Sequence, residues 1–348
     1  MKKSYLKNII FFIILILLTF FFLVRGQNLN YMFRTVAHVR WEYTFIGILL
    51  MSIYFIIQSY DIILILKNFG YKIKFFNAIR YVAVEYFYSA LTPSSTGGQP
   101  MQIYQMSKEG INISHCTIMV LLELCSYQIV ALIYMIIGLI INYKYLNSNL
   151  DFFKVLLIYG IVVTTIYITL LLIVLFSKKA TTLIKKVISF ILKKIKYKNY
   201  DKVMNTIEEE TGKYHDCAAY IKEHKDLLFK IIGMNFIRIL ASYSVTYITC
   251  RAFHLHVPYY RVVSLQAVLY TCVAAIPIPG TIGINEVGFG QIFLPVFTEE
   301  LISLATVLNR FMNFYFFVII TGIISVVSHV KPGKQKKLEN TDNIKQIK

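Results

Sequence analysis

The sequence is poor in charged residues and lacks the motifs that mark common soluble enzymes. Only 16% of its 348 residues are Asp, Glu, Lys or Arg, whereas soluble domains carry about 25%. The five cysteines form no CxxC pair, so neither a disulfide framework nor a zinc site is supported. The chain has no GxxxxGK[ST] phosphate loop, no GxSxG elbow and no HExxH helix. These absences argue against a cytosolic enzyme, and we predict neither a catalytic centre nor a metal or cofactor.

Hydrophobic sequence is what the chain has in abundance. Apolar residues make up 57% of it, and about 20 of them in a helix cross a bilayer core of about 30 Å. The composition therefore predicts an all-α integral membrane protein with about six full transmembrane helices. The apolar stretches lie at about 8–24, 43–66, 113–142, 152–177, 227–250 and 301–328. No small-x-small cleavage site follows the first stretch, which predicts a retained anchor helix.

Two further apolar stretches are interrupted by proline and glycine. The first, about 75–110, is broken at 91–100, and the second, about 258–298, is broken at 277–286. Irregular backbone is tolerated at membrane depth only inside protein or beside a water-filled cavity. We therefore expect two re-entrant helical hairpins, which dip into the bilayer from opposite sides.

The distribution of basic residues fixes an expected orientation. The formal net charge is +18, which in a soluble protein would suggest nucleic acid. If the N-terminus is cytoplasmic and each hairpin returns to its own side, most of the 36 Lys and Arg residues fall on the cytoplasmic side. This bias accounts for the charge without a nucleic-acid partner, and it places both termini in the cytoplasm.

The order span, hairpin, span occurs twice with opposite orientation. We expect one polytopic membrane domain over 1–330, with inverted halves at about 43–142 and 227–328. The helix 152–177 is the connector that inverts the second half. In inverted repeats, paired interrupted segments mark a substrate site near the bilayer midplane. Any chain with two breaks can be divided in this way, so the pattern alone leaves a simpler bundle open.

The segment 178–226 is the one long polar stretch between spans. Its apolar residues recur at helical spacing among lysines, which predicts a basic amphipathic helix. Such a helix suits anionic lipid headgroups, although a solvated connector helix would have the same pattern. The tail 331–348 is basic and polar, and we expect it to be disordered.

Ionisable residues at membrane depth are costly and mark functional sites by default. A fixed guanidinium would suit a lipid phosphate, because it offers two parallel donors. The alternative is a set of structural salt bridges that order the helices. The candidates are Glu85, Glu123, Arg238, Glu286 and Arg310, with Asn309 beside the last and Asp61 near a helix end.

The two breaks also resemble anion-binding machinery. Glycines let backbone N–H groups approach a ligand, and a helix starting just after Pro100 would direct its positive end to the same point. The alternative is that the prolines merely turn a hairpin. The candidate lipid-contacting residues are Thr92, Pro93, Ser94, Gly97, Gly98, Gln99 and Pro100 in the first break, and Pro277, Pro279, Gly280, Gly283 and Asn285 in the second.

Together the breaks resemble the two motifs of a known family. The sequences TPSSTGGQP at 92–100 and PIPGTIGINE at 277–286 are similar to those of the transmembrane, flippase-like region of lysylphosphatidylglycerol synthases, which includes stand-alone members. Arg310 falls where the family tends to carry an arginine in its last helix. The chain departs at Thr281, where glycine is common, and at Asn285, where arginine is frequent. The resemblance covers about 8–328.

This resemblance implies a lipid translocase in the bacterial cytoplasmic membrane. The substrate would be phosphatidylglycerol, its lysyl derivative or a polyprenyl-phosphate lipid. In the full synthases a soluble C-terminal domain transfers lysine, and the about 20 residues after the last span here are too few for it. Two alternatives remain: a membrane-embedded lysyltransferase-type enzyme, and a non-catalytic partner of an envelope glycosyltransferase acting through 178–226. A homo-oligomer is compatible with all three.

Overall fold

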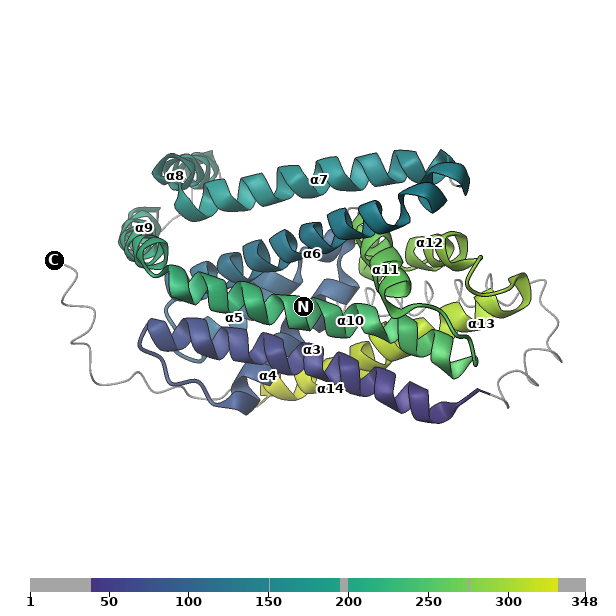
Figure 1. Ribbon diagram of the computed structural model, residues 1–348. Helices are drawn as coiled ribbons and strands as arrows, with labels where there is room; N and C mark the ends of the chain where they lie inside the picture. The colour runs from purple at the N-terminus through teal and green to yellow at the C-terminus, as the bar shows by residue number, and fades with distance from the viewer. Residues whose placement is uncertain (1–38, 150, 195–199, 275, 331–348) are drawn as a thin grey trace.

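The computed structural model describes residues 39–149, 151–194, 200–274 and 276–330, which form a helical bundle (Figure 1). No β-strand occurs among these residues. Five described helices are long and apolar enough to cross a membrane, and they match five of the six predicted spans. The spans are Trp41–Asn68 (α3), Ile113–Leu146 (in α6, Ile113–Asn149), Leu157–Phe176 (in α7, Asp151–Phe176), Lys225–Ala252 (α10) and Glu299–Ser328 (α13 to α14). The predicted anchor 8–24 and tail 331–348 lie outside the described residues.

The outer surface of these helices is apolar. Along α7, Ile158, Val162, Ile166 and Leu170 recur every fourth residue and are each about half exposed. An uncovered apolar stripe on the outside of a bundle is typical of a helix that faces lipid rather than water. The prediction of an all-α membrane protein is confirmed.

Both interrupted stretches fold as a pair of short helices around a turn. The first consists of α4 (Phe75–Leu91), η1 (Pro93–Ser95) and α5 (Gly98–Lys108). The second consists of α11 (Tyr259–Ala274), η2 (Pro279–Thr281) and α12 (Ile284–Phe293). Each helix is shorter than the roughly 20 residues that a full crossing needs. In Figure 1, α4 and α5 lie towards the end that carries α8 and α9, and α11 and α12 lie towards the other end. Their re-entrant insertion into a bilayer stays a prediction.

The backbone of the two breaks begins in the same way. A 3₁₀ turn starts at Pro93 in the first and at Pro279 in the second. Two positions later, each has a non-glycine residue in the left-handed region, Ser95 at φ 55° and Thr281 at φ 53°. The next helix begins five residues after the proline in both breaks. Such φ values are costly outside glycine, so their recurrence at one offset indicates that the two turns begin alike. The turns then differ, because Thr96 and Gly97 are right-handed helical, whereas Ile282 is extended and Gly283 has a φ of 87°.

The helices also pack in matching pairs. α3 lies against α10, α6 against α11, α4 against α14, and η1 against η2. A two-fold axis that exchanges the halves would leave the α3–α10 and η1–η2 contacts unchanged, and it would convert the α6–α11 contact into the α4–α14 contact. The packing thus has the pairing that an inverted repeat predicts, although the division into halves stays an inference.

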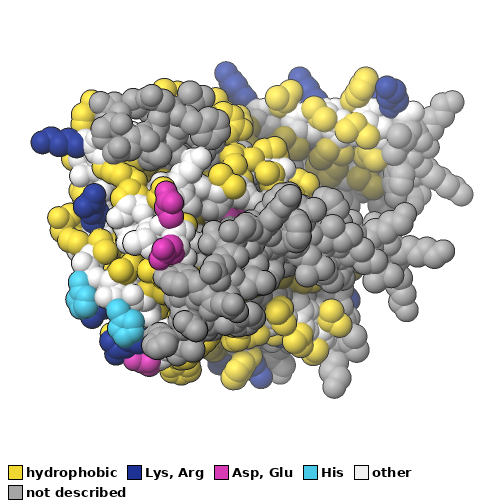
Figure 2. Space-filling model, turned by 90° about the vertical axis from the view of Figure 1, so that its right-hand side faces the viewer, with side chains coloured by type: hydrophobic (Ala, Val, Ile, Leu, Met, Phe, Trp, Pro, Cys, Tyr) yellow, Lys and Arg dark blue, Asp and Glu magenta, His cyan; other side chains and the backbone are white. Residues whose placement is uncertain are grey.

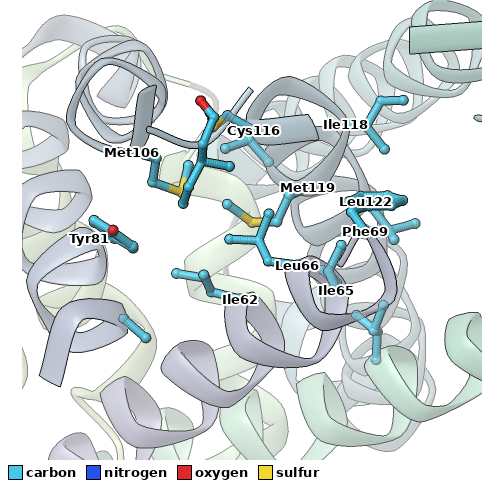
Figure 3. Packing of buried hydrophobic residues seen from close by; sticks show 14 of the residues in the cluster. Ile62, Ile65, Leu66, Phe69, Tyr81, Met106, Cys116, Ile118, Met119 and Leu122 are labelled. Atoms are coloured by element: carbon cyan, nitrogen blue, oxygen red, sulfur yellow. The ribbon is translucent and has the colours of Figure 1, made fainter. Parts of the chain in front are cut away.

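The largest apolar cluster among the described residues joins the first half to the insert at 178–226. In Figure 3, Ile62 and Leu66 of α3 lie close to Met106 of α5 and Met119 of α6. The same cluster includes Ile221 of α9 (Tyr200–Glu223), which is fully buried. The first hairpin and the insert are therefore held by one core.

The insert consists of α8 (Lys178–Lys194) and α9, and the two are attached differently. α9 packs on α6, and the Tyr214 hydroxyl donates to the Val174 carbonyl at 2.8 Å. α8 has no buried residue. Figure 1 shows α8 nearly end-on beside the end of α7, so α8 runs roughly across the direction of the spans. α8 lies where the basic amphipathic helix is predicted, and its docking on lipid stays a prediction.

Candidate functional site

The second break is held by a buried ion pair. The Arg310 Nε donates to Glu286 Oε1 at 2.7 Å, and the Arg310 Nη2 donates to the Gly280 carbonyl at 2.9 Å. The two charged side chains are only 7% and 1% exposed. The other Glu286 oxygen accepts from the Gly283 backbone N–H at 2.7 Å, at the N-terminus of α12. One carboxylate thus joins the turn, the helix start and the last span.

Glycine is required at two positions of this turn. Gly280 and Gly283 have φ values of 57° and 87°, which L side chains rarely adopt. A Cβ on Gly280 would also overlap the Phe314 ring. The Arg310 guanidinium lies 4.2 Å from the centroid of that ring, a cation–π distance.

A π-helical turn immediately follows Arg310 in the last span. The segment Phe311–Tyr315 has π geometry between α13 (Glu299–Arg310) and α14 (Phe316–Val330). Single π turns inside α-helices are frequent at functional sites, because they redirect side chains by about one residue. Here the turn carries Tyr315, whose hydroxyl donates to Glu286 Oε1 at 3.1 Å.

Asn309 belongs to a separate polar cluster beside this pair. Its Nδ2 donates to the hydroxyls of Thr246 at 3.0 Å and Thr249 at 3.1 Å on α10. Its Oδ1 accepts from Asn313 at 2.7 Å. Asn309 is therefore satisfied between two spans and holds α13 to α10.

The first break surrounds a carboxylate that has only neutral donors. Glu85 of α4 accepts from the Ser89 hydroxyl at 2.9 Å, from Gln99 Nε2 at 3.3 Å and from Gln58 Nε2 at 3.4 Å. Gln99 lies in the first turn of α5, where backbone N–H groups and the helix dipole favour negative charge. The break thus gathers its polar groups around Glu85.

The glycines of the first break are required by close contact rather than by φ. A Cβ on Gly98 would lie 2.5 Å from the Glu85 carbonyl oxygen and would overlap Ser89. A Cβ on Gly97 would lie 2.6 Å from Thr92 Cγ2. The Gly97 N–H donates to the Thr92 hydroxyl at 2.9 Å, which closes the turn. α5 begins at Gly98 and not after Pro100 as expected, because proline lacks only an N–H that the first helical turn leaves unpaired anyway.

A second buried ion pair lies between α6 and α10. The Arg238 Nη1 donates to Glu123 Oε1 at 2.8 Å, and the Arg238 Nη2 donates to the Tyr54 hydroxyl at 2.8 Å. The two charged side chains are 4% and 8% exposed. The guanidinium also lies over the rings of Tyr54 and Tyr127, at 4.3 Å and 5.0 Å. Removing one partner of such a pair costs about 3–5 kcal/mol, because a charge is left buried alone.

The two breaks meet inside the bundle. Ala90 at the end of α4, Ile282 of the second break, and Phe314 and Val318 of the last span form one buried cluster. The Tyr86 hydroxyl of α4 donates to the Asn313 carbonyl at 3.0 Å. Turns that are about 190 residues apart in sequence are thus brought together at one point.

The structure brings most of the predicted site residues to this region, in two groups. Glu85, Thr92, Gly97, Gly98 and Gln99 form one, and Gly280, Gly283, Glu286 and Arg310 form the other. Pro93, Pro100, Pro279 and Asn285 contribute turn and helix-start positions, and Pro277 lies just before the second turn. Arg238 and Glu123 pair with each other, and Ser94 lies in η1.

Sequence reasoning missed Gln58, Asn235 and Tyr54. All three contact the predicted charged residues, Gln58 at Glu85 and the other two at Arg238. A usable signal was present: Gln58 and Asp61, like Asn235 and Arg238, are polar pairs three residues apart within apolar spans. That spacing places both members of a pair on one helix face.

Comparison with known proteins agrees with this architecture. Residues 8–321 match the family model described as the lysylphosphatidylglycerol synthase TM region. The chain is also 20% identical over 295 residues to a UPF0104 membrane protein of Archaeoglobus fulgidus, which covers 80% of this chain and 84% of the relative. No solved structure matches the chain. The paired motifs, the five apolar spans and the family match lead to one assignment: the chain is a multi-pass membrane protein of the lysylphosphatidylglycerol synthase transmembrane-region family.

Proposed function

We propose that the protein moves a phospholipid or a polyprenyl-phosphate lipid between the leaflets of a bacterial cytoplasmic membrane. The observation that carries this proposal is the meeting of the two polar breaks inside an apolar bundle. Irregular backbone at membrane depth is tolerated only inside protein or beside a water-filled cavity, and buried charge there is costly and marks functional sites by default. A lipid headgroup is such a polar group, and its acyl chains would remain against the apolar outer surface.

Arg310 would bind the lipid phosphate by exchanging partners. In the structure its Nε donates to Glu286, and its Nη2 donates to the Gly280 carbonyl. A phosphate is a stronger bidentate acceptor than this split arrangement, because it matches the planar fork of one guanidinium. Glu286 would keep its bonds from Tyr315 and Gly283 during the exchange. The Arg238–Glu123 pair would provide a second phosphate position in the same manner.

Glu85 would bind the cationic part of an aminoacylated headgroup. It is the carboxylate of the first break, and the donors around it are neutral. An ammonium group would replace weak bonds of 3.3–3.4 Å with a charge-assisted one. A lysyl lipid would therefore use both breaks, and phosphatidylglycerol would use mainly the second.

We also propose that α8 rests on anionic headgroups. Leu183, Val187, Phe190 and Ile191 are 48–66% exposed on it. An open groove between α8 and α9 is lined by Lys185, Lys186, Lys193 and Phe190, among others. Apolar side chains beside clustered lysines suit the interface of an anionic membrane. Figure 2 shows the opposite end of the bundle, where the described Lys and Arg side chains are scattered around the rim.

A two-sided lipid assay tests the translocase. The purified chain would be reconstituted with fluorescent phosphatidylglycerol or its lysyl form, and outer-leaflet fluorescence would be bleached with dithionite over time. We expect the bleachable fraction to exceed that of protein-free vesicles, and Arg310→Ala to remove the excess. Arg261→Ala is the matched control, because Arg261 is exposed near the start of α11.

Two results would contradict the proposal. One is equal bleaching in the presence and absence of protein for phosphatidylglycerol, lysyl-phosphatidylglycerol and a polyprenyl-phosphate lipid. The other is full transport by Arg310→Ala. Formation of lysyl-phosphatidylglycerol from charged tRNA by the purified chain would instead support the transferase alternative. Loss of function on deleting 178–226, with tolerant membrane residues, would support an envelope-enzyme partner.

A further inference from the structure

A line of buried polar side chains connects the Arg238 pair to the first break. The Arg238 Nη1 donates to Asn235 Oδ1, and the Asn235 Nδ2 donates to Asp61 Oδ2, both at 3.4 Å. Farther along, Gln58 Nε2 donates to Glu85 Oε2 at 3.4 Å. Asp61, Gln58 and Asn235 are at most 2% exposed. Every donor in this line points from the arginine towards Glu85.

The line is interrupted at one place, where a hydrogen is missing. Among the described residues, Asp61 Oδ1 and Gln58 Oε1 are buried and have no hydrogen-bond partner. Both atoms are acceptors, and their residues lie three apart on the same face of α3. Each buried acceptor without a donor costs about 1–3 kcal/mol. A single O–H on Asp61 that donates to Gln58 would satisfy both.

Among the described residues, the hydrogen-bond donor to Asp61 is the neutral amide of Asn235, and no cation pairs with Asp61. The groups that act on it are Glu123 from α6 and Arg238 from α10, with Tyr54 of α3 and Glu85 of α4 farther along the network. Arg238 is already neutralised by Glu123 at 2.8 Å. The site therefore contains more carboxylates than cations, and a proton on Asp61 would supply the donor that its Oδ1 and Gln58 Oε1 lack. Two free oxygens are too few for a metal cation, which needs about six.

Turning the Gln58 amide over changes which carboxyl lacks a hydrogen-bond donor, from Asp61 to Glu85. The Gln58 Nε2 would then donate to Asp61 Oδ1, and its Oε1 would face Glu85. Glu85 would now need the O–H, whereas Asp61 would be satisfied as a carboxylate by Gln58 and Asn235. One proton therefore has two positions, one on Asp61 and one on the Glu85 oxygen that faces Gln58. The other Glu85 oxygen accepts from Ser89 and Gln99 at the first break.

We propose that Asp61 and Glu85 share one exchangeable proton through Gln58, and that this proton couples to lipid movement. The Asp61 O–H bond breaks and its proton passes to Gln58 Oε1, while Gln58 Nε2 releases a proton that forms an O–H bond on Glu85. The imidic acid left on Gln58 returns to the amide when the proton on its oxygen moves to its nitrogen, so the charge of the site is unchanged. The coupling depends on the translocase function proposed above, but the existence of the proton does not. A lipid ammonium at Glu85 would displace the proton from that position and favour its return to Asp61.

Infrared spectroscopy of the purified full chain tests the proton directly. At neutral pH, we expect a carbonyl band of a buried, protonated carboxyl that shifts in D₂O. Asp61→Asn should abolish the band, because the asparagine NH₂ supplies the missing donor to Gln58 without a proton. Glu85→Gln should retain it, because the proton is then confined to Asp61. Asp226→Asn is the matched control, since Asp226 is 68% exposed, and it should leave the band unchanged.

A transport measurement then tests the coupling. In proteoliposomes, a pH gradient should change the rate of lipid movement by the native chain, and in Asp61→Asn the rates with and without the gradient should be equal. The proposal is overturned if the native chain has no such band, if Asp61→Asn retains it, or if this variant still responds to the gradient. If the band behaves as expected but no lipid moves in any chain, the translocase function fails and the proton site stands.

Discussion

Neutralising Glu286 should reveal how much the Arg310 pair contributes to the second break. Glu286→Gln would keep the size of the side chain but leave the Arg310 charge buried, with its remaining bond to the Gly280 carbonyl. It would also place an NH₂ group among donors, because Arg310, Tyr315 and the Gly283 N–H all donate to Glu286. The side chains are 7% and 1% exposed, so water cannot compensate.

The expected loss is about 3–5 kcal/mol in the free energy of unfolding, the cost of breaking a buried pair by removing one partner. The double variant Glu286→Gln with Arg310→Met should recover part of this loss, because no unpaired charge remains. A double-mutant cycle with these variants and Arg310→Met alone gives the coupling energy. We expect a coupling well above the 0.2–1 kcal/mol typical of exposed pairs.

The described cysteines provide the assay. Cys116, Cys125, Cys217, Cys250 and Cys272 are all free and buried, so a thiol-reactive dye reports their exposure on heating. The predicted loss corresponds to a fall in the unfolding midpoint on the order of 5–10 °C. Glu300→Gln, at an exposed position in the first turn of α13, is the matched control. A midpoint for Glu286→Gln equal to that of the control, or a coupling energy near zero, would refute the argument.

Three further predictions concern other parts of the molecule. Gly98→Ala should lower the rate of lipid movement at least several-fold, because the added Cβ would displace the Glu85 backbone. Gly233→Ala is the control and should leave the rate unchanged, because Gly233 has open space around it. Equal rates for the two variants would contradict the close contact between Gly98 and Glu85. Replacing Lys185, Lys186, Lys193 and Lys194 of α8 with Gln should weaken the attraction of α8 for anionic lipid. The measurement is the salt-sensitive recruitment of anionic lipid around the reconstituted chain, and unchanged recruitment in the variant would disprove the α8 proposal. Burial opposes ionisation of Glu210, but hydrogen bonds from Ser114, Lys213 and Asn112 outweigh it and lower the Glu210 pKa. We therefore expect α9 to stay attached to α6 at pH above about 4.3 and to exchange its amide hydrogens faster as the pH falls through the folded-state pKa. Glu210→Gln should lack this pH dependence, and an identical exchange profile in the variant would exclude Glu210 as its cause.

The sequence predicted the spans well because their signal is local. Five stretches of about 20 apolar residues became helices within a few residues of the expected bounds. The breaks were also foreseeable, since proline and glycine act on their own backbone. The start of α5 was misplaced by three residues, because Pro100 is tolerated inside a first helical turn.

The pairing of charges could not be predicted from the sequence. Arg310 and Arg238 each had three carboxylates to choose from, and only packing decides which lie within reach. Arg238 reaches Glu123 because α6 and α10 lie side by side, 115 positions apart in sequence. The same reason hid Gln58 and Asn235, whose roles depend on neighbours in other helices.

The two breaks begin with similar turns but differ in how their carboxylates are held, and under the proposed function this difference bears on how each would open. In the second break, Glu286 lies seven residues after the turn proline and is paired with Arg310. The equivalent position in the first break is Pro100, so its carboxylate comes from the preceding helix as Glu85, with neutral donors only. Opening the second break must separate a buried ion pair, which costs about 3–5 kcal/mol unless an anion such as a lipid phosphate replaces Glu286. Opening the first must break hydrogen bonds from neutral donors to the Glu85 carboxylate, worth about 1.5–3 kcal/mol each. A phosphate is therefore the ligand that would open the second break, and a proton or an ammonium group is the one that would act on the first.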